Sequence, residues 1–526
     1  MNSTQIQFVW PELANPWKKA SQQFKTAFWS ACFFGVITHI YVFTNLLLNH
    51  DSVWHIYFDN YSLASGRWIL RALSDISTRF QMPVVIAVIS VFMLALTAGI
   101  TVSVLNISHK VAAVLTGAFI VTIPSVACIF SYMFTADAYF ICLFMNAVAV
   151  YVAKKYSWGW FPAIILCASA CGGYQAFICY AIGLFLMDCI LELLTNRPVR
   201  DIVRKGFRYV FIVIFSLLLY YLVLLVLLKV NGESLTSYQG IDSMSLTNME
   251  GFLSQIPKTY QDFIQYFRTS PYSTKFYQTV QVLFCALSFA ALCYLAVIEK
   301  IYRDPLRLAL LLAGCLLLPM ALNFITILSA GGWVHALMIY SFVLLYVFML
   351  KLIELALQRM ITKGMSDWPI VHLAGILLAG LLIWNNFCVS NMAYLRLQLI
   401  YENSFALANR IAARIEELDG YAPELPVAVV GEASRSLYGG TVSEFSQINS
   451  LTGTTDRVLF SPEPHVRTRT FIEHYIGLHM PRPSQGQISM LKQSGVIETM
   501  PSYPQPGSVL LYDEVIIVKL SDGSIR

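Results

Sequence analysis

Ionisable side chains gather in one short stretch, NHDSVWHIYFDNYSLASGRW, at residues 49–68. It holds two carboxylates, Asp51 and Asp59, and a guanidinium, Arg67; Arg71 follows one helical turn later. A carboxylate can take the proton from an attacking hydroxyl. An arginine can bind a phosphodiester through two hydrogen bonds and offset the charge that grows on it as it leaves. The stretch therefore suits transfer of a group, such as a sugar, from a lipid-linked phosphate to a hydroxyl.

The same residues also allow structural interpretations. Asp51 follows an apolar run and could cap a helix, and Asp59 could lie on a solvated face. Arg67 and Arg71 could anchor the chain to anionic lipid headgroups. The two histidines of the stretch favour interfacial packing over metal binding, because one pair beside two carboxylates is a weak metal signal. The sequence demands no metal and no other cofactor, although it does not exclude a divalent ion.

Three further places carry polar residues at the ends of apolar runs. Asp137 lies in PSVACIFSYMFTADAYF. A carboxylate in the first turn of a helix would be stabilised by the helix dipole, and Thr135 could cap the same end. Tyr174 and Gln175 follow two glycines and could hydrogen-bond a sugar, although a tyrosine there also suits an aromatic belt. His335, in GGWVHALMIYSF, favours packing but could contact a substrate.

The composition indicates the elements that must hold these residues. The chain has 526 residues, of which 57% are hydrophobic and 12% charged, and its mean hydropathy is +0.63. Soluble domains carry about twice that charge. Apolar runs of about 20 residues recur, each long enough to cross about 30 Å of hydrocarbon. We expect a polytopic α-helical membrane protein with about eleven transmembrane helices. They are predicted at 27–48, 82–105, 111–133, 136–153, 158–172, 175–194, 207–229, 276–298, 305–328, 333–351 and 369–388.

Lysine and arginine predict the orientation. They cluster before the first span and in alternate loops, at 109–110, 154–155, 197–208, 299–307 and 358–367. Because basic loops stay in the cytoplasm, the N-terminus is expected there. The loops 49–81 and 230–275, with the turns at Asp137 and Tyr174, then face outward. An odd number of spans places the C-terminal region on that outer side as well.

The last part of the chain differs in character. Residues 1–390 are expected to form the transmembrane domain, and residues 391–526 a small periplasmic α/β domain. Within the latter, 395–418 has helical apolar spacing, PVAVVGE resembles a buried strand, and 508–520 predicts two strands around a turn. The eleven cysteines lack CxxC spacing and lie within or beside apolar segments, which predicts buried thiols without disulfides.

Several function classes find no support. The sequence has no P-loop motif, no GxGxxG after a strand, no HExxH and no DxD, and its cytoplasmic loops are too short to form a catalytic domain. The small net charge gives no indication of nucleic-acid binding. Ionisable residues are scarce near the middle of the spans, which argues against an ion-coupled transporter.

Taken together, these motifs resemble the bacterial glucosyltransferase II family, integral-membrane O-antigen glucosyltransferases associated with serotype conversion. The resemblance rests on HDS…YSLASGRWILRAL, PSVACIFSYMFTADAYF, CGGYQAFICYAIGLFL and the segment 391–418 followed by PVAVVGE. It implies a GT-C type fold. Asp51 matches the first acid of the family's acidic pair, whereas the second position is Ser52, so Asp59 or Asp137 would share the role of the base.

The resemblance also implies partners. The donor would be a polyprenyl-phosphate-linked sugar, with glucose expected. Another glycosyltransferase would make it, and a flippase would move it across the membrane. The acceptor would be lipid-linked O-antigen or a related surface polysaccharide, at the periplasmic face of the bacterial inner membrane.

We therefore predict a membrane glycosyltransferase with Asp51 as general base and Asp59 or Asp137 orienting the acceptor. Arg67 and Arg71 would bind the donor phosphate, while Tyr174, Gln175 and His335 would contact substrate. The main alternative is a transporter or flippase of a lipid-linked saccharide. A non-catalytic scaffold in polysaccharide assembly is a third.

Overall fold

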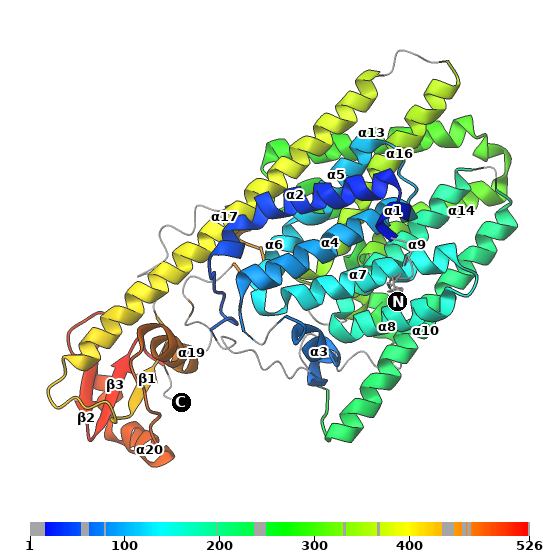
Figure 1. Ribbon diagram of the computed structural model, residues 1–526. Helices are drawn as coiled ribbons and strands as arrows, with labels where there is room; N and C mark the ends of the chain where they lie inside the picture. The colour runs from blue at the N-terminus through cyan, green and yellow to red at the C-terminus, as the bar shows by residue number, and fades with distance from the viewer. Residues whose placement is uncertain are drawn as a thin grey trace, which may run out of the picture.

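A computed structural model shows a helical bundle joined to a small mixed domain (Figure 1). It describes residues 16–53, 63–77, 80–195, 197–235, 249–329, 333–364, 369–433, 446–454, 459 and 464–523. Asp59 lies outside the described residues. All eleven cysteines are free thiols; five are buried as predicted, five are half-buried, and Cys293 is exposed.

Within the described part of the chain, ten helical segments are long and apolar enough to cross a membrane. They are α2 (Gln22–Thr44), α4 (Pro83–Val104), α5 (Lys110–Thr122) with α6 (Pro124–Ser131), α7 (Met133–Lys155), η2 (Gln175–Phe177) with α9 (Ile178–Leu193), α10 (Val199–Asn231), α13 (Lys275–Ile298), α14 (Pro305–Leu322), η5 (Ala336–Phe342) with α16 (Val343–Thr362), and α17 (Pro369–Glu416). An eleventh apolar helix, α8 (Trp160–Gly173), is shorter and packs against α7 and α10. The polytopic helical fold with about eleven apolar helices is therefore confirmed.

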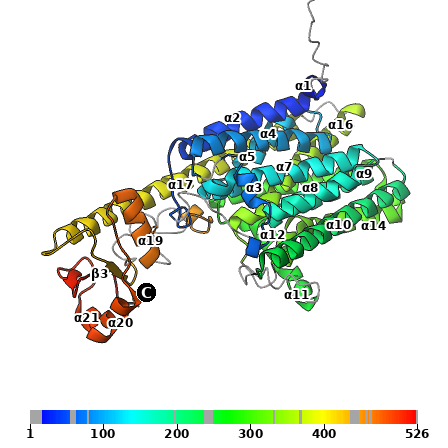
Figure 2. The ribbon, with the colours of Figure 1, turned by 60° about the horizontal axis from the view of Figure 1, so that its bottom comes forward.

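Shorter elements fill the connections between the apolar helices. They are α1 (Pro16–Lys19), η1 (Leu63–Ser65), α3 (Leu70–Ser74), α11 (Met249–Ser254), α12 (Ile256–Thr269), η4 (Ile301–Arg303) and α15 (Phe324–Leu328). The described part of residues 53–73 does not form one continuous helix. There the chain forms η1, a turn at Gly66 (φ +77°) and then α3. Figure 2 shows α11 and α12 at the lower edge of the bundle.

Three apolar segments are interrupted where they approach one another. The α5–α6 break falls at Ile123, before Pro124, whose ring lacks the amide hydrogen that a continuous helix needs. The α14–α15 break falls at Asn323, and η5 forms the first turns before α16. η5 packs against α6, η2 and α14. Irregular backbone at this depth is therefore enclosed by protein, where it can be tolerated.

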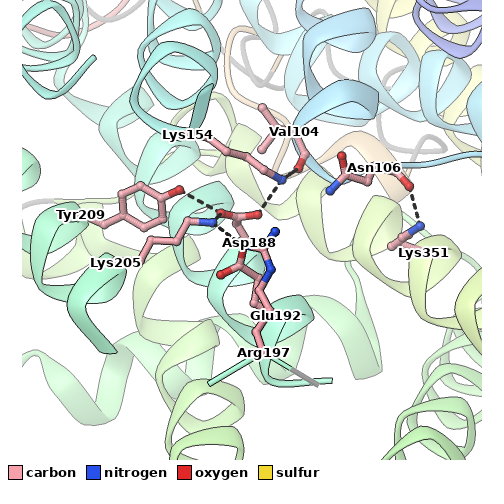
Figure 3. A network of polar contacts seen from close by, with 9 residues as sticks. All are labelled: Val104, Asn106, Lys154, Asp188, Glu192, Arg197, Lys205, Tyr209 and Lys351. Carbon is pink, nitrogen blue, oxygen red and sulfur yellow. Dashed lines mark hydrogen bonds and ion pairs between the residues drawn. The ribbon is translucent and has the colours of Figure 1, made fainter. Parts of the chain in front are cut away.

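The loops rich in lysine and arginine meet at one end of the bundle, here called the basic end. Figure 3 shows the contacts of Lys154, Asp188 and Lys205, which come from α7, α9 and α10. The Asp188 carboxylate lies 2.7 Å from Lys154 Nζ and 2.5 Å from Lys205 Nζ. Lys351 Nζ donates to the Asn106 carbonyl at 2.6 Å and joins α16 to the loop after α4.

The same end is closed by contacts between loops. Arg307 donates to the carbonyls of Thr195 and Arg197, and Arg359 pairs with Glu299 at 2.7 Å. The alternate loops that the sequence grouped by their charge thus lie together. The opposite end, which adjoins the C-terminal domain, is called the domain end.

The C-terminal domain contains a three-stranded sheet of order β1-β3-β2. β1 (Val427–Val430) pairs with β3 (Val515–Lys519) in parallel, and β2 (Val509–Tyr512) forms an antiparallel hairpin with β3. The predicted turn at Asp513–Glu514 is present, and both residues have positive φ. The remaining elements are η6 (Ser446–Ile448), α19 (Pro464–Phe471), η7 (Ile472–Ile476), α20 (Gln485–Ser494) and α21 (Val496–Thr499).

One helix connects the two parts of the molecule. α17 runs unbroken for 48 residues, past position 390, where the sequence suggests a domain boundary (Figure 1). Its later turns bury Ile400, Leu407 and Ile411 in one face of the domain core. The C-terminal domain is therefore built on the last turns of a bundle helix.

Candidate active site at the start of α7

Arg67 lies among tyrosines at the domain end. Its Nη1 donates to the Tyr139 hydroxyl at 3.2 Å, and its Cζ lies 5.2 Å from the centre of the Tyr174 ring. The two tyrosine rings stack with centroids 4.3 Å apart. A guanidinium held by one hydrogen bond and one cation–π contact has a fixed plane. Arg67 and Tyr174, which the sequence predicts to bind donor phosphate and substrate respectively, are thus in contact, and Tyr139 joins them.

Gln175 fastens the Arg67 loop to the bundle. Its Nε2 donates to the Ser65 carbonyl and to the Tyr220 hydroxyl, each at 3.0 Å. The Tyr220 hydroxyl in turn donates to the Gly66 carbonyl at 3.0 Å. Gln175 is buried, so its amide holds the loop beside Arg67 in place. A bound sugar would contact the residues around Gln175 and not its amide.

Glycines allow the two sequence blocks to meet. A Cβ on Gly66 would lie 2.5 Å from the Tyr220 hydroxyl oxygen, and a Cβ on Gly172 would lie 2.3 Å from the Trp68 ring. Ile69 N also donates to the Gly172 carbonyl at 3.0 Å. The block SLASGRW and the block CGGYQ are far apart in the sequence but form one packed unit.

Asp137 lies on the same helix as Tyr139, two residues earlier. It is only 1% exposed, and the Ser77 side chain lies beside its carboxylate. Its Oδ1 accepts from Ala138 N at 2.8 Å, whereas Oδ2 has no hydrogen-bond partner among the residues that the structure describes. A buried acceptor without a partner is costly in a purely structural role, which makes this oxygen a candidate for contact with a bound hydroxyl.

The predicted cap by Thr135 is wrong. α7 begins at Met133 after Tyr132, which makes no side-chain capping bond, and the Thr135 hydroxyl donates to the Tyr132 carbonyl instead. Asp137 consequently sits just beyond the first turn and does not occupy a capping position.

Asp51 lies between the bundle and the C-terminal domain. Asn49 Oδ1 accepts from the amides of Asp51 and Ser52 and fixes a tight turn, so Asp51 does not cap a helix. Leu48 and Val53, on either side, are fully buried in the core of the C-terminal domain. The Asp51 side chain is 41% exposed, and its carboxylate therefore remains accessible.

Arg467 of α19 is the partner that the sequence did not reveal. Its Nη2 lies 3.6 Å from Asp51 Oδ1, and His50 Nε2 lies 3.5 Å from the same oxygen. The His50 ring also packs edge-on against Tyr132, just before α7. The Asp51 turn thus reaches the start of α7 through His50, Arg67 reaches α7 through Tyr139, and Asp137 lies on α7 itself.

The remaining predicted residues fall in different places. Arg71 is exposed on α3, one turn beyond Arg67. His335 lies away from Arg67, on the wall of a separate pocket of about 720 Å³, and burial lowers its pKa. In the part of the chain that is described, no group of three or more His, Cys, Asp or Glu side chains could hold a metal ion.

The arrangement combines accessible and buried acids with an oriented guanidinium. An accessible carboxylate can accept a proton, and a guanidinium with a fixed plane can bind two oxygens of one phosphate. The geometry thus supplies the groups that transfer from a phosphate-linked donor requires. Sequence reasoning missed Tyr139, Tyr220 and Arg467, because each is defined only by contacts distant in the chain.

A comparison with family models agrees with this reading. The model described as Glucosyl transferase GtrII matches residues 40–346, which is more than half of the chain and includes Asp51, Arg67, Asp137 and the Tyr174–Gln175 turn. Comparisons with curated proteins and with solved structures give no match. The chain therefore belongs to the GtrII family of glucosyl transferases.

Proposed function

We propose that this glucosyltransferase moves glucose from a polyprenyl-phosphate-linked donor to O-antigen or a related surface polysaccharide on the periplasmic face of the inner membrane. The observation that supports it most is the position of Arg67. Its guanidinium is oriented by Tyr139 and Tyr174 at the end of an apolar bundle. A donor with its tail in the bilayer would present its phosphate at that level.

Arg67 and Arg71 are assigned to the donor phosphate. The phosphate gains negative charge as the glycosidic bond breaks, and a positioned guanidinium offsets that charge best in the transition state. Arg71 is exposed and lies one turn from Arg67, so it suits the outer phosphate oxygens. Polyprenyl phosphate is then the leaving group.

Asp51 is assigned as the general base. It would take the proton of the acceptor hydroxyl as that oxygen attacks the anomeric carbon. Its turn is anchored by Leu48 and Val53 in the C-terminal domain, and Arg467 contacts its carboxylate. Asp137 would orient the acceptor through its unpartnered oxygen. Asp59 stays a further candidate from the sequence.

The periplasmic assignment follows from the basic end. If the lysine- and arginine-rich loops stay in the cytoplasm, the domain end and its site face the periplasm. The donor would then come from a separate synthesising enzyme and a flippase. Labelling of the domain end from only one side of the membrane decides whether that end faces the periplasm or the cytoplasm.

The test is transfer of labelled glucose by the purified full-length chain. Polyprenyl-phosphate glucose is the donor, and unmodified polysaccharide from cells lacking the protein is the acceptor. We expect Asp51→Asn to lower kcat by about 10²- to 10⁴-fold, the range of general base catalysis. Glu402→Gln is the matched control, because Glu402 is an exposed acid on α17 without a role in the site.

Two results would contradict the proposal. Full activity of Asp51→Asn would place the base elsewhere. Movement of intact donor across vesicle membranes without covalent transfer would instead identify a flippase.

A further inference from the structure

A pocket lined by polar and aromatic side chains lies at the domain end, and Arg67 is not among its lining residues. It has a volume of about 720 Å³, within the range of small-ligand sites. Its walls are α12, the turn after α12, the segment 333–336, and the start of η5. None of the roles assigned so far uses this space, apart from the predicted contact of His335 with substrate.

The wall formed by α12 carries a continuous row of hydrogen-bonding side chains. Gln255, Lys258, Asp262 and Gln265 line the pocket, at positions i, i+3, i+7 and i+10 of one helical face. The adjacent face buries Thr259, Phe263, Tyr266 and Phe267 in the bundle. Burial of that apolar face fixes the rotation of the helix, and the row is thereby held toward the pocket.

The floor contains a polar atom that lacks a partner. Asn323, at the α14–α15 break, is fully buried and lines the pocket. Its Nδ2 donates to the Thr259 carbonyl at 3.1 Å, and this bond sets the orientation of the amide. Its Oδ1 is buried and has no hydrogen-bond partner among the described residues. Such an oxygen is costly when empty and suits a ligand that brings a donor.

An aromatic side chain also lines the pocket. Trp333 lines the pocket, yet it is 81% exposed. His335 lies beside it, and burial lowers the pKa of this imidazole, which favours its neutral form. An indole offers a flat apolar surface, whereas the polar side chains of the same pocket offer both donors and acceptors.

This combination fits a sugar better than a phosphate. Each sugar hydroxyl donates one hydrogen bond and accepts others, and the ring carbons present an apolar face that can stack on an indole. A phosphate offers only acceptors. It would meet the Asp262 carboxylate and Asn323 Oδ1, with Lys258 as the single cation of the row. Burial raises the pKa of Asp262 while Lys258 opposes that change.

The pocket is connected to the Arg67 cluster through packed rings. Ile339 and Phe342 of η5 line the pocket, and Tyr340 lies 6.1 Å from the Phe177 ring of η2. Phe177 in turn lies 5.0 Å from Tyr174. Ala336 N also donates to Thr452 Oγ1 at 3.0 Å. This hydrogen bond ties the start of η5 to the C-terminal segment.

We propose that this pocket binds a hexopyranose unit of the acceptor polysaccharide, away from the sugar that receives glucose. Trp333 would stack on the ring, and the α12 row with Asn323 would bind its hydroxyls. The assignment as an acceptor subsite rests on the proposed function, whereas saccharide binding itself does not.

The test is equilibrium binding without any donor. The purified full-length chain is titrated into fluorescently labelled, lipid-free polysaccharide from cells lacking the protein, and anisotropy is followed. We expect Trp333→Ala and Gln265→Ala each to weaken binding by about tenfold or more. Both side chains are exposed, so their removal leaves the fold intact.

Matched controls share residue type and exposure. Gln261→Ala lies on α12 but outside the pocket, and Trp158→Ala removes an exposed indole at the other end of the bundle. Both should bind as the wild type does. In the transfer assay, Trp333→Ala should raise the KM for acceptor and leave the KM for donor unchanged.

Three outcomes would overturn the inference. They are no binding by the wild type, equal binding by Gln265→Ala and Gln261→Ala, or displacement of the polysaccharide by short-chain phosphatidylglycerol but not by free hexose. The last would identify a lipid site. Loss of transfer from polyprenyl-phosphate glucose with intact polysaccharide binding would count against the proposed donor alone.

Discussion

At the scale of single residues, the orientation of the Arg67 guanidinium is set by its neighbours. Tyr139 binds one end of the guanidinium and Tyr174 covers its face, so the two contacts fix the plane of the guanidinium. Lysine keeps the charge but is a flexible point donor without a plane. This difference separates a phosphate-binding arginine from an arginine that only anchors the chain to headgroups.

Replacement of Arg67 by lysine should therefore reduce transfer. We expect Arg67→Lys to lower kcat/KM for the donor by about 10- to 100-fold, equivalent to the loss of one or two charged hydrogen bonds. Arg303→Lys, at an exposed arginine of the basic end, is the control. Steady-state kinetics with varied donor measures both. An unchanged kcat/KM for donor in Arg67→Lys would leave Arg67 with a structural role.

The sequence draws attention to acids and arginines but not to their partners. Asp51, Arg67 and Asp137 stand out because ionisable side chains are rare in an apolar chain. Arg467 and Tyr220 do not stand out, because an arginine in a polar domain and a tyrosine in a span are common. Their importance follows from contacts across hundreds of residues, which a single sequence does not encode locally.

At the scale of elements, the turn at Gly66 joins the first loop to the bundle. Its φ of +77° favours glycine, and a Cβ there would displace both the Tyr220 hydroxyl and the Gln175 amide. The Arg67 loop can consequently pack against Tyr220 and Gln175 only when position 66 has no side chain.

Substitution of Gly66 should affect stability and activity together. We expect Gly66→Ala to destabilise the protein by about 1–3 kcal/mol, from left-handed strain and the two displaced hydrogen bonds. Gly206→Ala in α10 meets no atom within 4 Å and should be neutral or slightly stabilising. Thermal unfolding in detergent measures the difference. Equal midpoints for the two variants would show that the loop is not held by this turn.

The sequence predicted the long apolar helices but missed α12 in the 230–275 loop. The signal was present, since its polar and apolar residues recur at helical spacing. It was obscured because the loop is long and polar overall. The breaks at Ile123 and Asn323 could not be located either, since each depends on packing between segments distant in the sequence.

At the scale of the whole molecule, the ion network of the basic end fixes how the helices assemble. Asp188 is 2% exposed and lies between Lys154 and Lys205, so it joins α7, α9 and α10 (Figure 3). Two half-buried ammonium groups share this carboxylate, and Lys205 also pairs with Glu192 at 2.8 Å. The network explains why loops of like charge can approach each other closely.

Removal of that carboxylate should weaken the whole bundle. We expect Asp188→Asn to cost up to about 3–5 kcal/mol, because it removes the counterion of Lys154 and leaves Lys205 with Glu192 alone. Arg197→Ala, which removes an arginine that is 64% exposed, should cost less than about 1 kcal/mol. Unfolding in detergent tests this comparison. A small effect of Asp188→Asn would mean that water reaches the network.

The uninterrupted course of α17 has a consequence for reach. At about 1.5 Å per residue, its 48 residues make a rod of about 72 Å, with one end among the spans and the other inside the sheet domain. A tilt of about one degree at the base would carry the far tip by roughly 1 Å. The C-terminal domain therefore cannot swing as on a tether, because the rigid length of α17 sets its distance from the bundle.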